Sequence, residues 1–155
     1  MDKKLKSGKL SIGDNFSGFL TIGDVHGDID SFLKAVTYAQ DNNLFLISLG
    51  DIVDYGDNSV DVFEVLANLV RKDQAEMILG NHELKNWKYF TQKKTGNITT
   101  QMQDKHWVSV NGFEERDLVD DFLNFLDQRQ HILYTEYDGG KIILLGSLCT
   151  GYDLE

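Results

Sequence analysis

The chain has 155 residues, of which 41% are hydrophobic and 26% charged, a composition typical of one soluble globular domain. Its 15 basic and 25 acidic residues give a net charge of -10, which excludes non-specific binding to nucleic acid or to an anionic membrane by bulk electrostatics. A single cysteine excludes an internal disulfide framework, and no apolar run approaches the roughly 18 residues of a membrane span. Because the first residues also lack the apolar core of a signal peptide, we expect a cytoplasmic protein.

The first half of the chain repeats one pattern three times. Each copy has a short continuous apolar run, then a glycine followed by Asp or Asn, then apolar residues at helical spacing. The runs cover residues 19–22, 44–49 and 77–79, and the helices are predicted to begin near 28, 59 and 83. Continuous runs are typical of strands buried on both faces, and copies roughly 30 residues apart match strand–helix–strand units. The pattern therefore predicts an α/β fold with a parallel sheet.

The second half breaks this pattern. Residues from about 94 to 114 are polar and irregular, and we interpret them as an inserted loop or cap. Residues 117–128 have the apolar spacing of an amphipathic helix. Residues 132–137 and 141–145 flank an Asp-Gly-Gly turn, which is typical of a β-hairpin. We expect one domain over 1–155, with residues 1–15 as an N-terminal extension.

Polar motifs follow all three apolar runs. They are Gly23-Asp24-Val25-His26-Gly27-Asp28, Gly50-Asp51-Ile52-Val53-Asp54 and Gly80-Asn81-His82-Glu83. Because the carboxyl ends of neighbouring parallel strands meet at one edge of a sheet, we expect Asp24, Asp51 and Asn81 to lie close together. Carboxylate, imidazole and amide ligands suit Mn²⁺, Fe²⁺ or Zn²⁺, and a carboxylate between two such ions bridges them at about 3.5–4 Å. The motifs therefore predict a site for one or two divalent ions.

This set of motifs resembles the calcineurin-like metallophosphoesterases, most of all the serine/threonine phosphoprotein phosphatases, including the compact phage lambda type. The family motifs GDxHG, GDxxDRG and GNHE occur here in the same order. The resemblance implies a four-layer metallophosphoesterase sandwich, two β-sheets flanked by helices, which is truncated here at its C-terminus.

The resemblance also implies roles for individual residues. Asp24 and His26 would bind a first metal, Asp51 would bridge to a second, and Asn81 would bind that second metal. His82 would be the general acid that protonates the leaving oxygen. Asp54 would hydrogen-bond His82 and keep it protonated. Mn²⁺ is the expected ion, with Fe²⁺ and Zn²⁺ as alternatives.

The sequence departs from the family pattern at several places. Tyr55 and Leu79 stand where phosphoprotein phosphatases have phosphate-binding arginines. Gly146 stands where a strand end supplies a histidine to the second metal, and the chain ends at Glu155, before the last histidine ligand. By ligand count the second metal site is weak or empty. Tyr55 is interpreted as an exposed loop residue, with stacking on a substrate ring as the alternative.

Two histidines lie outside the motifs, and we interpret both His106 and His131 as surface or boundary residues. The leading expectation for function is a serine/threonine-phosphatase-like phosphomonoesterase that uses a metal-activated hydroxide and His82 as acid. Two alternatives stay open: a pseudo-phosphatase impaired at the second metal site, and a phosphodiesterase or nucleotide pyrophosphatase, which Leu79 and Tyr55 favour. The substrate is a phosphoprotein or a small phosphoester. Because a shortened sheet exposes an edge, poor solubility or a homodimer is a further expectation.

Overall fold

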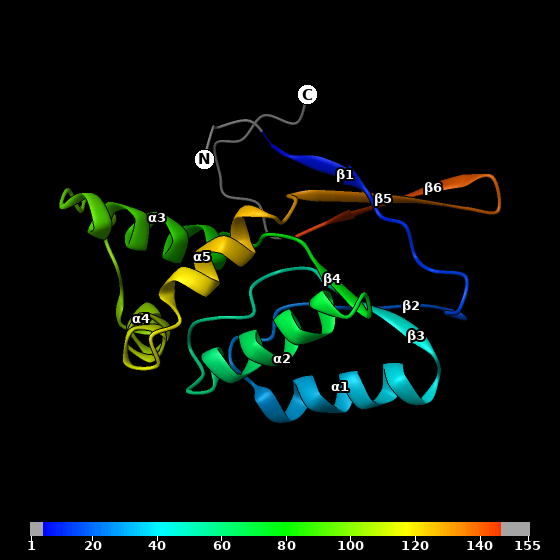
Figure 1. The fold of residues 1–155 in the computed structure, drawn as a ribbon, viewed down its shortest axis with the longest axis horizontal. Helices are drawn as coiled ribbons and strands as arrows, with labels where there is room; N and C mark the ends of the chain where they lie inside the picture. The colour runs from blue at the N-terminus through cyan, green and yellow to red at the C-terminus, as the bar shows by residue number, and fades with distance from the viewer. Residues whose placement is uncertain (1–4, 147–155) are drawn as a thin grey trace.

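The computed structural model describes residues 5–146, apart from the side chain of Tyr137, and shows two three-stranded sheets with five helices in that range (Figure 1). The strands are β1 Ser7–Lys9, β2 Gly18–Ile22, β3 Leu44–Ser48, β4 Ala75–Met77, β5 Ile132–Tyr137 and β6 Gly140–Leu145. The helices are α1 Ile29–Asp41, α2 Ser59–Arg71, α3 Asn81–Thr95, α4 Asp104–Glu115 and α5 Val119–Asp127. The predicted α/β class is confirmed.

The three repeated copies form the first sheet, in the order β2–β3–β4 with all strands parallel. Ile22 pairs with Ser48, and Ser48 pairs with Met77, so the three strands end at one edge. The third strand begins and ends two residues earlier than predicted. Ile78 still donates its backbone N–H to the Ser48 carbonyl of β3, at 2.9 Å, but Leu79 donates to the carbonyl of Gln130, at 2.9 Å, near the other sheet.

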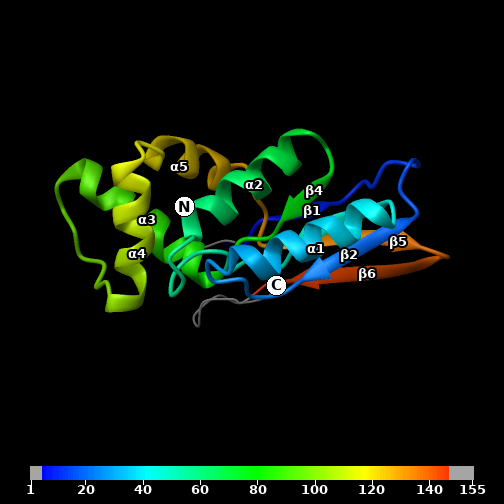
Figure 2. The same ribbon diagram turned by 90° about the horizontal axis from the view of Figure 1, so that it is seen from below.

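Helices α1 and α2 cover one face of this sheet, as Figure 2 shows. Asp28 caps α1 by accepting the backbone N–H of Ser31 at 3.0 Å. Side chains at helical spacing from both helices fill the main core, among them Phe32 and Val36 from α1 and Phe63 from α2. The predicted periodicity of both helices is confirmed.

The second sheet has the order β1–β5–β6. Strands β5 and β6 form the predicted antiparallel hairpin. The segment expected to be an N-terminal extension supplies β1, which pairs in parallel with β5. A three-residue strand is too short to show a periodic pattern, so the sequence did not reveal it. Leu133 and Leu144 of this sheet pack against Phe45 and Ile47 of β3 in a second core cluster.

Residues 5–146 form three layers: helices α1 and α2, the sheet β2–β3–β4, and the sheet β1–β5–β6 (Figures 1 and 2). Within that range no helix packs on the outer face of β1–β5–β6, so the four-layer sandwich stays a prediction. Residues 147–155, where the C-terminal truncation was expected, lie outside the described range. None of the described helices is long and apolar enough to cross a membrane.

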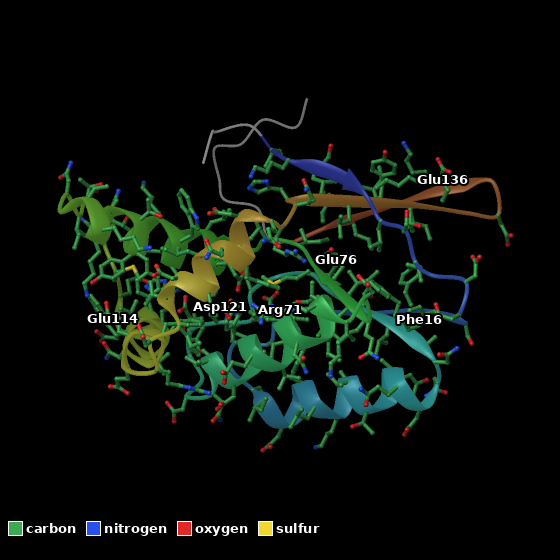
Figure 3. The ribbon with its side chains drawn as sticks, viewed as in Figure 1. Phe16, Arg71, Glu76, Glu114, Asp121 and Glu136 are labelled. Atoms are coloured by element: carbon green, nitrogen blue, oxygen red, sulfur yellow. The ribbon has the colours of Figure 1, made fainter. Side chains whose placement is uncertain are left out.

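Helices α3, α4 and α5 pack together beside the other layers (Figure 1). We interpreted residues 94–114 as an inserted loop or cap, and the irregular-loop alternative is wrong for residues 104–114, which belong to α4. Its buried side chains include Val110 and Phe113, but polar residues between them hide the helical spacing. The ring of Phe113 stacks on Phe122 of α5 at 4.1 Å between centroids. An ion pair between Arg71 and Asp121 further joins α2 to α5 (Figure 3).

Candidate metal centre

The three polar motifs meet at the carboxyl edge of β2–β3–β4. The loop after β2 lies against the loop after β3, because the backbone N–H groups of Val25 and His26 both donate to the carbonyl of Asp51 at 3.0 Å. Gly50 lies against Gly80, where a Cβ on Gly50 would be 2.5 Å from the Gly80 nitrogen. Gly50 also has a φ of 94°, so only glycine allows this close approach without strain.

His26, Asp51 and His82 each offer one nitrogen or oxygen, and these atoms lie within 4.8 Å of one another. The Nδ1 atom of His26 is 2.8 Å from the Val53 carbonyl, so this nitrogen carries the proton and Nε2 is left to bind an ion. Asp24 lies beside this group, with its Oδ2 3.9 Å from His26 Nε2 and an exposed side chain. Such mixed nitrogen and oxygen donors suit a divalent transition ion.

The Asn81 amide faces the carboxylate of Asp51. With its nitrogen toward Asp51, it donates hydrogen bonds of 3.1 and 2.9 Å to the two carboxylate oxygens. A metal-binding role requires the opposite orientation, in which the amide oxygen and the carboxylate face a shared cation. The residues predicted to hold metal are therefore brought together, and their chemistry fits a divalent ion.

His82 lies between this group and a buried carboxylate. Its Nδ1 is 2.7 Å from Asp54 Oδ2, and Asn86 donates to both oxygens of Asp54 at 3.0 and 3.1 Å. The hydrogen bond to Asp54 raises the pKa of His82, burial opposes this, and the negative charge of Asp51 adds to it. With Nδ1 engaged, Nε2 is the nitrogen left to give a proton to a ligand.

Glu83 organises the loop that carries Asp51. Its carboxylate is fully buried and accepts backbone N–H groups of Asp51 and Ile52 at 2.8 Å and of Gly80 at 3.0 Å. Burial, followed by the charge of Asp51, raises the pKa of Glu83 to about 7, while these N–H groups oppose the shift. Sequence analysis assigned no role to Glu83, although a Glu three residues after a helix N-cap is a capping signal.

His106 is a functional candidate that the sequence did not place at the site. It is 2% exposed, so the prediction of a surface or boundary residue is wrong. Its Nδ1 accepts the Gln103 N–H at 2.9 Å, which leaves the proton on Nε2, 3.8 Å from Asp54 Oδ2. Because α4 was not predicted, nothing in the sequence placed His106 near Asp54 and His82.

His131 is also buried, at 1% exposed, so its surface assignment is wrong too. It accepts the backbone N–H of Lys6, the residue before β1, at 3.0 Å and therefore stabilises the second sheet.

Two residues at which the sequence departs from the family pattern carry no polar side chain to the site. Leu79 is buried in the main core. The backbone at Gly146, just after β6, lies against the backbone at Leu49, just after β3. A Cβ on Gly146 would be 2.3 Å from the Leu49 carbonyl oxygen, so there is no room for a side chain at this position.

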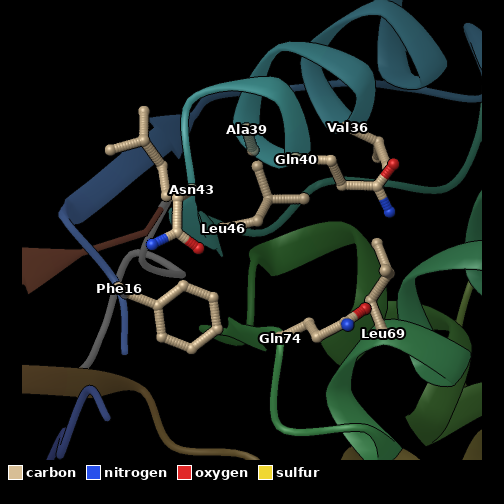
Figure 4. Close-up of a pocket in the computed structure, with 9 residues that line it drawn as sticks. Phe16, Val36, Ala39, Gln40, Asn43, Leu46, Leu69 and Gln74 are labelled. Atoms are coloured by element: carbon tan, nitrogen blue, oxygen red, sulfur yellow. The ribbon is translucent and has the colours of Figure 1, made fainter. Parts of the chain in front are cut away.

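A cavity lies elsewhere among the described residues. It measures about 250 Å³ and is lined by Phe16, by apolar residues of α1, α2 and β3, and by three amide side chains (Figure 4). Its lining contains Leu44, the first residue of β3, and so lies at the opposite end of the strands from Asp51. None of its lining side chains is titratable, so the acid–base and metal chemistry belongs to the carboxyl edge.

Residues 18–147 match the family model described as calcineurin-like phosphoesterase. The chain belongs to this family. The prediction of a calcineurin-like metallophosphoesterase from the three motifs is therefore confirmed at the level of the superfamily. The described fold matches that of the family over part of its length.

The chain is also similar to individual proteins. The chain is similar to a bis(5'-nucleosyl)-tetraphosphatase PrpE from Oceanobacillus iheyensis, at 29% identity over 123 residues, covering 73% of this chain and 46% of that protein. A solved structure described as a proposed diadenosine tetraphosphatase has a TM-score of 0.50 at 23% identity, covering 84% of this chain and 50% of that one. A protein serine/threonine phosphatase from Saccharomyces cerevisiae also has a TM-score of 0.50, at 14% identity, covering 86% and 39%. The two structures show likeness of fold alone, and the chain spans about half the length of the curated relatives it matches.

Proposed function

We propose that the protein is a metal-dependent phosphoesterase that cleaves a phosphoanhydride bond in a nucleotide, most simply in a dinucleoside polyphosphate. The observation that carries this proposal is the meeting of His26, Asp51 and His82, with Asp54 bonded to the far side of His82. The nucleotide substrate is supported by the PrpE relative. It is also supported by Tyr55 and Leu79, which replace the two arginines expected in a phosphoprotein phosphatase.

In this proposal Asp24, His26, Asp51 and Asn81 hold the ion or ions. A divalent ion bound there would supply Lewis-acid polarisation of the phosphoryl group and of the attacking water. His82 gives its Nε2 proton to the leaving phosphate oxygen, and Asp54 stabilises the protonated ring that precedes this transfer. Asn86 holds Asp54 in place, so the acid is positioned before substrate arrives.

Hydrolysis assays with Mn²⁺ test the proposal. Diadenosine tetraphosphate, p-nitrophenyl phosphate and its bis ester separate an anhydride hydrolase from a phosphomonoesterase and a phosphodiesterase. We expect diadenosine tetraphosphate to be the preferred substrate. We expect His82→Asn to lower kcat by about 10²–10⁴-fold, the usual contribution of a general acid. Asp73→Asn, on an exposed turn away from the site, is the control and should behave like wild type.

Metal binding separates this proposal from the impaired pseudo-phosphatase. Calorimetric titration of the metal-free protein with Mn²⁺ should show binding that Asp51→Asn removes. The absence of any site tighter than millimolar, together with no hydrolysis of the three substrates, would favour the pseudo-phosphatase. Gly146 is the observation behind that alternative, because it brings no side chain to the edge where Asp51 and Asn81 lie.

A further inference from the structure

Tyr55 is held in a strained conformation beside the candidate metal centre. Both Asp54 and Tyr55 have positive φ, at 72° and 64°, although neither is glycine. Such backbone conformations are costly for residues with a Cβ and persist where surrounding contacts enforce them. Tyr55 is 57% exposed, yet its ring centroid is 4.8 Å from that of His26 and 5.7 Å from that of His82. An open aromatic surface therefore adjoins the residues proposed to act on phosphorus.

Helix α4 enforces this conformation. The Tyr55 N–H donates to the Lys105 carbonyl at 2.9 Å, and the Asp54 N–H donates to Ser109 Oγ at 2.8 Å. His106, between these two residues of α4, faces Asp54. The segment that reads as a polar insert thus forms one wall of the site.

Lys105 places a positive charge on that wall. Its Nζ donates to the Tyr55 hydroxyl at 2.9 Å and lies 4.9 Å from the ring centroid. In a chain with a net charge of -10, a phosphorylated ligand needs a local cation to offset repulsion. Lys105 supplies one beside the position where the family pattern has an arginine and this chain has Tyr55.

We propose that Tyr55 and Lys105 form a recognition pair for a nucleotide, in which the Tyr55 ring stacks on the base and the Lys105 ammonium contacts a phosphate oxygen. This inference rests on the proposed function and adds to it the part of the substrate that the metal residues do not touch. An aromatic face takes any base, because every base has a π-face, so the pair selects for a ring and not for one base. The lysine acts as a point charge and does not demand the paired geometry of an arginine.

Two substrates that share the anhydride bond test the pair. Diadenosine tetraphosphate carries bases, and inorganic tripolyphosphate does not. Tyr55→Asn is the main variant, because asparagine tolerates positive φ and leaves the backbone undisturbed. We expect it to raise the ratio of the KM for diadenosine tetraphosphate to the KM for tripolyphosphate about tenfold, which is within the range of one base–aromatic stack. Tyr55→Phe keeps the ring and should keep the ratio near that of wild type.

Lys105→Met should instead raise the KM for both substrates, because both carry phosphate. The matched controls are Tyr38→Ala, whose side chain on α1 is likewise 57% exposed, and Lys88→Met, on an exposed position of α3. Both controls should leave the two KM values as in wild type. An equal effect of Tyr55→Asn on both substrates, or no effect on either, would overturn the inference.

Failure of the proposed function gives a different result. If wild-type protein hydrolyses neither substrate with saturating Mn²⁺, the hydrolase proposal fails, and binding decides the inference alone. Calorimetric titration with adenosine monophosphate and with ribose 5-phosphate then compares a ligand with a base to one without. A preference for the former that Tyr55→Asn removes supports the pair, and equal affinity of wild type for both ligands overturns it.

Discussion

Asp54 and His82 act as one unit at the scale of single residues. The folded protein raises the pKa of His82 above the ordinary histidine value of 6.5, first through the hydrogen bond to Asp54. The pair therefore contributes stability in full below pH 6.5, and this contribution is lost as the pH rises through the folded pKa. The same bond keeps the acid protonated where the proposed reaction needs it.

NMR titration of the metal-free protein checks this shift. The His82 ring signals should titrate above pH 6.5, and Asp54→Asn should move the midpoint down, because the accepting carboxylate is gone. His131 is an internal contrast, since burial lowers its pKa and its signals should titrate below 6.5. A His82 midpoint that does not respond to Asp54→Asn would contradict the pairing.

Glu83 gives a second prediction for a single residue. Glu83→Gln replaces one carboxylate oxygen with an amide nitrogen that cannot accept the N–H groups of Asp51 and Gly80. We expect a loss of about 1–3 kcal/mol in the free energy of unfolding, the usual cost of leaving buried polar groups unpaired. Urea denaturation of the metal-free protein measures this loss, with Glu115→Gln at the last, exposed position of α4 as the control. Equal stability of both variants would show that the carboxylate does not organise the loop.

The motif residues were predicted to lie at one sheet edge, as the structure has them, but the residues that surround Asp54 were not predicted. Asp24, His26, Asp51 and Asn81 follow apolar runs directly, so local order along the chain was enough to bring them to one edge. Asn86, His106 and Ser109 reach Asp54 from other elements, and only tertiary packing brings them there. Their residue types alone do not distinguish them from ordinary polar surface residues.

Among the helices and strands, too, only those with a regular apolar pattern were predicted. Helices α1 and α2 were predicted near their observed starts because their apolar spacing is regular. Helix α4 was missed because its buried residues are few and mixed with polar ones, including a buried histidine and serine. A short strand such as β1 has no period to detect, and its pairing with β5 joins residues more than a hundred positions apart.

Phe113 tests whether α4 is an essential part of the core. Its ring is fully buried, stacks on Phe122 and meets Phe63 edge-on at 5.3 Å. Phe113→Ala should lower the free energy of unfolding by about 3–5 kcal/mol, the usual cost of deleting a buried aromatic ring. Trp107→Ala, on the same helix but 38% exposed, should cost clearly less in the same denaturation experiment. Equal, small losses would mean that α4 behaves as a surface loop.

At the scale of the whole molecule, the candidate site lies where the layers meet the helices α3–α5. The first sheet supplies the metal residues, α3 supplies His82 and Glu83, and α4 supplies the wall beside Tyr55. Each of these parts packs into a hydrophobic core away from the reacting groups, and such packing holds reacting groups in place. Within the described range, the second sheet contributes no side chain to the group His26, Asp51 and His82. Its packing against β3 instead stabilises the strand that carries Asp51 at its end.

The surface of that second sheet leads to a prediction about association. Within residues 5–146, β6 pairs only with β5, and Ile143 and Leu145 of β6 are 59% and 43% exposed. An apolar strand at a sheet edge is a template for pairing with another chain. We therefore expect the protein to self-associate as its concentration rises, which agrees with the homodimer expected from the sequence. Light scattering coupled to size-exclusion chromatography measures this.

The variant Ile143→Lys, which puts a charge on that edge, should shift the protein toward monomer at every concentration, because a lysine that must face another strand loses its hydration. Leu33→Lys is the matched control, since Leu33 on α1 is exposed to a similar degree, at 42%, but lies on a helix whose backbone offers no free edge. If both variants reduce association equally, general surface hydrophobicity drives it and the strand edge does not. A wild-type protein that stays monomeric across the whole concentration range would contradict the prediction.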